Sequence, residues 1–120
     1  MPRWLGSPVM SLFFTAKSEN ERYSRQIRNS ADIAVFISDA NDKAHCIEAG
    51  RCYERFSLHA TTLGIRNAFL NQSVEVTAIR PQFASWLDLG PTARPNLVVR
   101  LGRGRTMPLL MRRPVQYVLV

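Results

Sequence analysis

Apolar and polar positions divide the chain into alternating helical and extended segments. Ser18, followed three residues later by Glu21, has the spacing of a capping box and predicts a helix over 19–29. The continuous apolar run IAVFI over 33–37 contains mainly β-formers and predicts a strand that is covered on both faces.

The longest predicted helix follows that strand. Asn41 or Asp42 can cap its start, and Gly64 provides a stop after Leu63. Apolar residues recur along it at spacings of three and four, so we expect them to face the core. This stripe consists of Ala49, Cys52, Phe56, Ala60 and Leu63.

The second half of the chain contains shorter predicted elements. They are an extended segment over 65–71, a helix over 81–87, a strand over 96–101 and an apolar edge segment over 115–120. Pro81 suits the first turn of its helix, and Gly90 and Pro91 end it. The order of helices and strands predicts an α+β fold, a sheet with helices packed on it.

Charge is unevenly distributed. The chain has a net charge of +7, and the part from Leu89 onward contains six arginines and no acidic residue. An anion site is therefore expected on the C-terminal strand and the residues after it, because arginine can hold two phosphate oxygens at once. Two alternatives remain open: a solvated run of surface charge, or a small basic module that binds nucleic acid.

Cys46 and Cys52 are the only cysteines and fall within one predicted helix. Six residues of helix separate them by ~9 Å and turn them to different faces, so they cannot form a disulfide with each other. Unpaired thiols favour a reducing cytoplasm. The start of the chain, MPRWLGSPVMSLFFTA, does not have the pattern of a secretory signal, and no stretch reaches the ~20 apolar residues of a membrane span.

Familiar catalytic and metal motifs are not found. His45 and Cys52, and likewise Cys52 and His59, are ~10.5 Å apart along a helix, which is too far for ligands of one zinc ion. No serine or cysteine is tied by motif to a histidine, and LGRGRT lacks the lysine of a phosphate-binding P-loop. We therefore expect no metal site and no catalytic side chain.

Three segments together resemble a known family. They are HCIEAGRCYERFSLHATTLGIRNAFLNQSVEV over 45–76, RPNLVVRLGRG and MRRPVQYVL. In order and spacing they resemble the C-terminal half of the FMN-dependent nitroreductases, closest to a bacterial branch of longer members. The resemblance extends from about Phe13 to Val120.

The resemblance implies a cofactor site. Arg112, two residues before Pro114, matches the arginine that holds the FMN phosphate, and Arg113 would be a second donor. Leu70, Asn71 and Gln72 match the backbone that passes beside the reactive edge of the flavin ring. Leu110 stands where family members often carry another basic residue.

The resemblance also implies a fold and an activity. The expected fold is the C-terminal portion of a nitroreductase-like three-layer α/β sandwich, with an irregular segment over 1–17 and a partial domain over 18–120. The family's N-terminal phosphate-binding stretch has no match, so we expect a truncated reading frame, a misplaced start or a remnant. The implied protein is a cytoplasmic homodimer that binds FMN and passes electrons from NAD(P)H to a quinone or nitro compound. A degenerate, non-enzymatic flavin-fold fragment remains the alternative.

Overall fold

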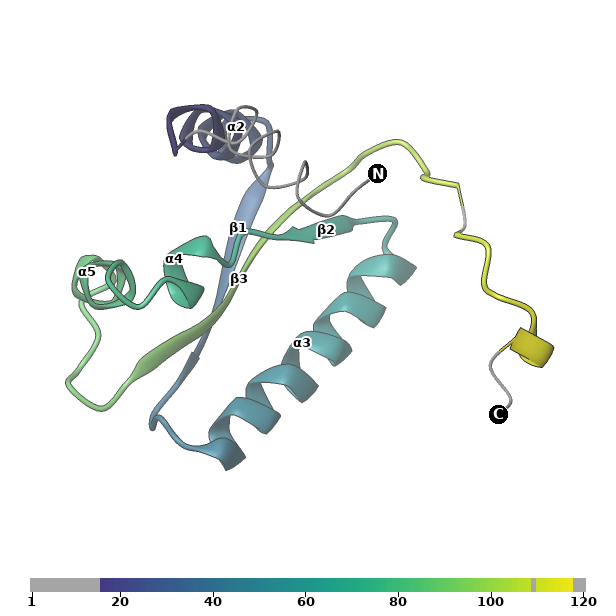
Figure 1. Ribbon diagram of the computed structural model, residues 1–120. Coiled ribbons are helices and arrows are strands. Elements are labelled where there is room, and N and C mark those ends of the chain that lie inside the picture. The colour runs from purple at the N-terminus through teal and green to yellow at the C-terminus, as the bar shows by residue number, and fades with distance from the viewer. Residues whose placement is uncertain (1–15, 109, 118–120) are drawn as a thin grey trace, which may run out of the picture.

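The chain folds as a three-stranded antiparallel sheet with helices on both faces (Figure 1). This computed structural model describes residues 16–108 and 110–117. The elements are α2 (Ala16–Arg28), β1 (Asp32–Ser38), α3 (Lys43–Thr62), β2 (Arg66–Phe69), α4 (Gln72–Glu75), α5 (Arg80–Trp86), β3 (Arg94–Gly102) and η1 (Val115–Tyr117). The predicted α+β class is confirmed.

The strand β3 lies at the centre of the sheet, in the order β1-β3-β2. Val99 on β3 is opposite Ala34 on one side and Phe69 on the other, and it is completely buried. The pairing with β1 shifts register between Phe36 and Ile37. Pro95 lies at this irregularity, where a residue without an N–H is tolerated in a sheet.

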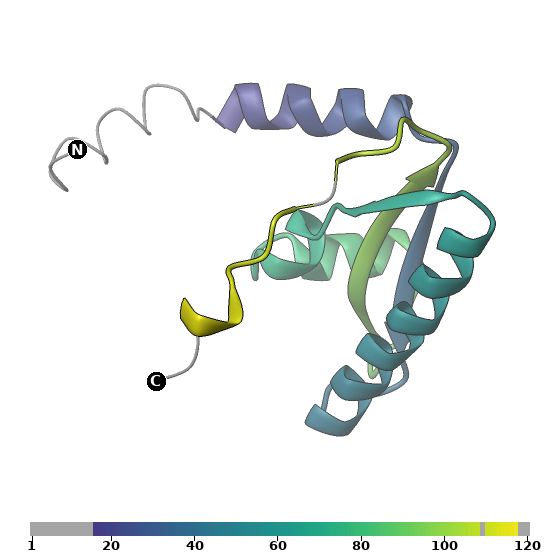
Figure 2. The same ribbon diagram turned by 90° about the vertical axis from the view of Figure 1, so that its right-hand side faces the viewer.

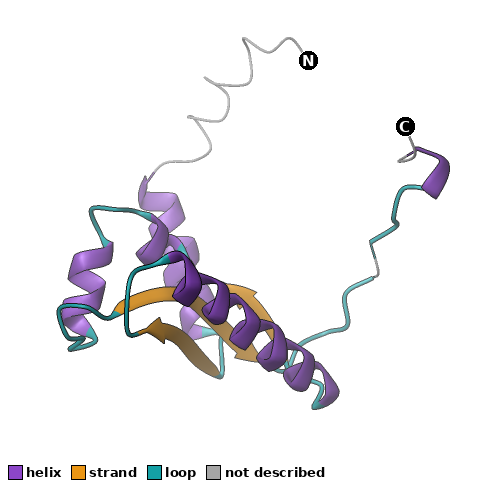
Figure 3. Ribbon diagram, turned by 90° about the horizontal axis from the view of Figure 1, so that it is seen from below, coloured by secondary structure: helices purple, strands orange, loops and turns teal. Residues whose placement is uncertain are grey.

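Helix α3 covers one face of the sheet, and α4 and α5 lie over the other, with α2 beside them (Figures 1 and 3). On the α3 face, the ring of Phe36 is in edge contact with Tyr53 and Phe56, at centroid distances of 5.9 and 5.5 Å. On the opposite face, Leu70, Val74 and Val98 form a buried cluster. Strand side chains alternate between the two faces, so each face receives its own apolar set.

The predicted limits of α3 are confirmed. Asp42 is the N-cap, and its carboxylate accepts a hydrogen bond from the His45 N–H at 2.9 Å. Gly64 has a φ of 69°, the left-handed conformation that ends a helix. The expectation that Cys52 faces the core is wrong: Cys52 is exposed, and Tyr53 packs on the sheet in its place.

Other boundaries differ from the prediction. Helix α2 begins at Ala16, inside the segment expected to be irregular, and residues 1–15 lie outside the described part. The four-residue helix α4 was not predicted. Val115–Tyr117, expected as part of an edge segment, is an exposed 3₁₀ turn, and 118–120 also lie outside the described residues.

Candidate functional site

An apolar groove lies on the sheet face opposite α3. It has a volume of about 570 Å³, within the ~300–1,000 Å³ typical of small-molecule sites. Its walls come from α2, α4 and α5, and its floor from β1, β3 and the end of β2. The lining residues are Tyr23, Ile27, Ile33, Val35, Leu70, Gln72, Ser73, Phe83, Trp86, Leu87 and Val98.

Strand alternation forms the floor of this apolar groove. Val35 is opposite Val98 in the antiparallel pairing, and directly opposed residues point to the same face. Ile33 and Leu70 extend the floor to either side. None of the lining residues carries a formal charge, so the groove favours an apolar ligand.

The helical wall of the groove is aromatic and open to solvent. Phe83 and Trp86 on α5 are stacked, with ring planes 13° apart and centroids 6.1 Å apart. Trp86 is 78% exposed, although it lies on the apolar side of α5. Ile27 on α2 is 45% exposed. These rings and the aliphatic side chain are therefore accessible to a ligand.

Leu70 and Gln72, two of the three residues that the family resemblance assigns to the flavin ring, line the apolar groove. The Leu70 N–H, however, donates to the carbonyl of Val98 at 2.8 Å. That N–H is therefore already bonded within the fold. Leu70 can contribute its buried side chain to the groove floor, and Gln72 is the exposed polar residue at this edge.

Asn71 has a structural role at the same edge. Its side-chain oxygen Oδ1 accepts a hydrogen bond from the Val98 N–H at 3.0 Å, so the side chain continues the β2–β3 ladder after β2 has ended. Its backbone carbonyl accepts from the N–H groups of Val74 and Glu75 at 2.9 and 2.8 Å and so begins α4. Asn71 does not line the apolar groove.

Arg112 and Arg113 lie on a different part of the molecule from Leu70–Gln72. Both are exposed in the segment that leaves the end of β3 (Figures 1 and 2), and Figure 1 shows this segment extending on the side opposite to α4. The neighbouring Met111 is 99% exposed. A single chain therefore does not bring the expected phosphate-binding arginines together with the expected ring-binding residues.

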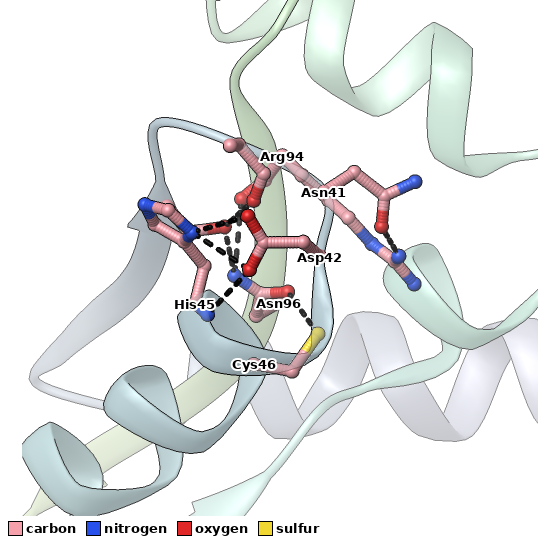
Figure 4. A network of polar contacts seen from close by, with 8 residues as sticks. Asn41, Asp42, His45, Cys46, Arg94 and Asn96 are labelled. Atoms are coloured by element: carbon pink, nitrogen blue, oxygen red, sulfur yellow. Dashed lines mark hydrogen bonds and ion pairs between the residues drawn. The ribbon is translucent and has the colours of Figure 1, made fainter.

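A polar network surrounds the N-terminus of α3 (Figure 4). The ring of His45 contacts the Asp42 carboxylate at 2.8 Å, and the Asn96 amide donates to Ser38 Oγ at 2.7 Å. The His45 backbone N–H, and then its ring, hold the pKa of Asp42 below the ordinary value of 3.8. We interpret this network as a helix cap that joins α3 to the sheet.

Metal-binding residues and thiols do not gather in the described part of the chain. Within residues 16–108 and 110–117, no three His, Cys, Asp or Glu side chains are close enough to share a metal ion. Cys46 and Cys52 are free and exposed, which confirms that they do not pair. Among the described helices, none has the length and apolar content needed to cross a bilayer.

Comparison with protein-family models, curated proteins and solved structures gives no match for this chain.

Proposed function

We propose that the chain is an FMN-binding oxidoreductase of nitroreductase type, in which the apolar groove receives the flavin ring. FMN, when bound, would supply the hydride chemistry between NAD(P)H and a quinone or nitro acceptor. The chain itself would hold the ring, exclude water from one side of it and orient its edge. No side chain of the protein is required to transfer a proton.

The observation that carries this proposal is the apolar groove with Leu70 and Gln72 at its edge. The groove residues fit the ring: the floor of Val35 and Val98 is apolar, and the stacked Phe83 and Trp86 offer an aromatic wall. The Gln72 amide has both donors and an acceptor, which suits the polar edge of an isoalloxazine. The helix–sheet–helix layering is compatible with the family's three-layer sandwich.

We further propose that the phosphate-binding arginines reach the groove from a second copy. The segment that carries Arg112 and Arg113 exposes a series of apolar side chains, each at least 69% accessible: Met107, Leu110, Met111 and Val115. Such a surface is typical of a segment that packs against another chain. A homodimer, with the segment of one copy beside the groove of the other, is the arrangement that this exposure supports; a cytoplasmic location is a separate proposal, based on the unpaired cysteines.

Flavin titration of the purified 120-residue chain tests the proposal. Quenching of FMN fluorescence should be saturable, and NADH or NADPH should then be oxidised in the presence of a quinone. Trp86→Ala removes an aromatic contact worth about 0.5–1.5 kcal/mol, so FMN affinity should fall by up to about tenfold. Leu58→Ala is the matched control, because Leu58 is 65% exposed on α3, across the sheet from the groove.

Equal FMN affinity of the two variants would exclude the groove as the ring site. Saturable FMN binding without NAD(P)H oxidation would instead support a non-enzymatic, degenerate flavin-fold fragment.

A second candidate function is nucleic-acid binding. It is favoured by the exposure of four arginines in the segment after β3: Arg103, Arg105, Arg112 and Arg113. Phosphate contacts of this kind make affinity fall steeply with salt, with a slope of about 0.9 per contact on a logarithmic plot for duplex DNA. Colourless protein that binds DNA in this salt-dependent way would favour the second candidate.

A further inference from the structure

Two arginines converge on the sheet face that also carries the apolar groove. Arg66 on β2 is opposite Gly102 on β3, and Ala68 is opposite Arg100. Arg66 and Arg100 are therefore diagonal neighbours, close enough for long side chains to meet. The residues opposite them, Gly102 and Ala68, have no bulky side chains, and Ala31 lies next to Gly102.

These arginines line a second hollow, which we call the basic cleft. It has a volume of about 200 Å³ and is lined by Arg66, Arg100 and Arg103, with Asn29 and Ser30 closing it on the α2 side. No acidic residue lines it. The neighbouring strand does carry Asp32, but Asp32 is opposite Leu101, so its side chain points to the other face of the sheet.

The positive charge in the basic cleft is not neutralised by the described residues. In the part of the chain that the structure describes, none of the three arginines forms an ion pair. Arg66 makes only a long contact of 3.4 Å with Thr106 Oγ1. The Nε of Arg100 is buried and donates no hydrogen bond to a described residue. A buried donor without an acceptor and three nearby like charges are both unfavourable, and a bound anion would relieve both.

We propose that the basic cleft binds a phosphate group. Guanidinium groups bind phosphate oxygens in pairs, and the arginines remain charged at any physiological pH. The cleft is smaller than the ~300 Å³ at which sites for whole drug-sized ligands begin, so it suits a single anionic group. This site is separate from Arg112 and Arg113 and does not depend on the proposed flavin function.

The phosphate can be free or attached to a larger ligand. Val98 on the groove floor and Arg100 in the basic cleft are two residues apart on β3, a rise of about 7 Å. A ligand with an apolar body and a terminal phosphate could therefore span both hollows. Titration with inorganic phosphate, FMN and riboflavin distinguishes a free phosphate from one attached to a larger ligand, since FMN and riboflavin differ only by the phosphate.

Calorimetric titration of the 120-residue chain, at constant ionic strength, tests the basic cleft. Inorganic phosphate should bind saturably in the millimolar range or tighter, and Arg100→Gln should weaken it about tenfold or more, as for loss of a charge-assisted hydrogen bond. Arg103→Gln should also weaken it. Arg103 is exposed beyond the end of β3, so we expect the Arg103→Gln variant to fold normally. Arg105→Gln is the control. Arg105 is exposed and does not line the cleft, and its replacement removes the same positive charge.

If Arg105→Gln weakens phosphate binding as much as Arg100→Gln does, phosphate responds only to the net positive charge, and the proposal is overturned. A lack of saturable phosphate binding would also overturn it. If inorganic phosphate binds but neither FMN nor riboflavin does, the proposal of a phosphate site in the basic cleft stands and the proposed flavin function is excluded. FMN binding that exceeds riboflavin binding, with the difference abolished by Arg100→Gln, would place the FMN phosphate in the basic cleft in place of Arg112 and Arg113.

Discussion

Replacement of Asn71 by alanine should destabilise the fold at the edge of the apolar groove. The side chain of Asn71 supplies the acceptor for the Val98 N–H at 3.0 Å, at a point where β2 has already ended. Val98 is 5% exposed and belongs to the buried cluster with Leu70 and Val74. Water therefore cannot easily replace the lost acceptor.

The magnitude follows from the burial of that N–H. A buried donor left without a partner costs about 1–3 kcal/mol, so the free energy of unfolding should fall by that amount in Asn71→Ala. Asn71→Asp keeps an acceptor at the same position and should retain more of the stability. The backbone contacts that begin α4 are unchanged in both variants, because they use the carbonyl of residue 71.

Urea unfolding followed by far-UV circular dichroism measures the effect. Gln72→Ala is the control, since Gln72 is exposed and adjacent and should change stability by no more than about 0.5 kcal/mol. If Asn71→Ala and Gln72→Ala unfold at the same urea concentration, the hydrogen bond to Val98 does not support the groove edge and the reasoning fails.

Two further outcomes are expected. Asp42→Ala should lower the free energy of unfolding, and the loss relative to wild type should shrink below pH 3.8. The reason is that a carboxyl whose pKa is lowered by folding stabilises the fold fully above its unfolded pKa and loses this contribution as the pH falls. A loss of stability that is the same in urea unfolding at acid and neutral pH would contradict the cap. Arg112→Ala should weaken FMN binding by about 1.5–3 kcal/mol if the second copy supplies this arginine, as measured by fluorescence titration; unchanged affinity would remove Arg112 from the site.

Local signals predicted much of the fold. The Asp42 cap and the Gly64 stop fixed the limits of α3 because each acts within a few residues of the chain. Pro81 correctly marked the first turn of α5 for the same reason. Such features need no knowledge of distant partners.

Features that depend on distant contacts could not be predicted. Helix α4 begins where Asn71 bonds to β3, which is a tertiary contact, and four residues give no periodicity. Either Cys52 or Tyr53 fits the apolar spacing of α3 nearly equally well, and only the contact with Phe36 determines that Tyr53 faces the sheet.

The candidate site was predictable only in part. The resemblance pointed to Leu70 and Gln72, which line the groove. The charge distribution indicated anion binding by the C-terminal strand. It did not indicate that Arg66, on a different strand, lies beside Arg100, because that follows only from the register of β2 on β3.

The most direct test of the flavin proposal is to locate the bound ring by nuclear Overhauser effects between the isoalloxazine protons of FMN and protein methyl groups. We predict contacts to the methyls of Leu70, Val35 and Val98 on the groove floor. Contacts to Leu58 on the opposite side of the sheet, or no intermolecular contacts under conditions where FMN is in excess, would contradict the proposal that the apolar groove receives the flavin.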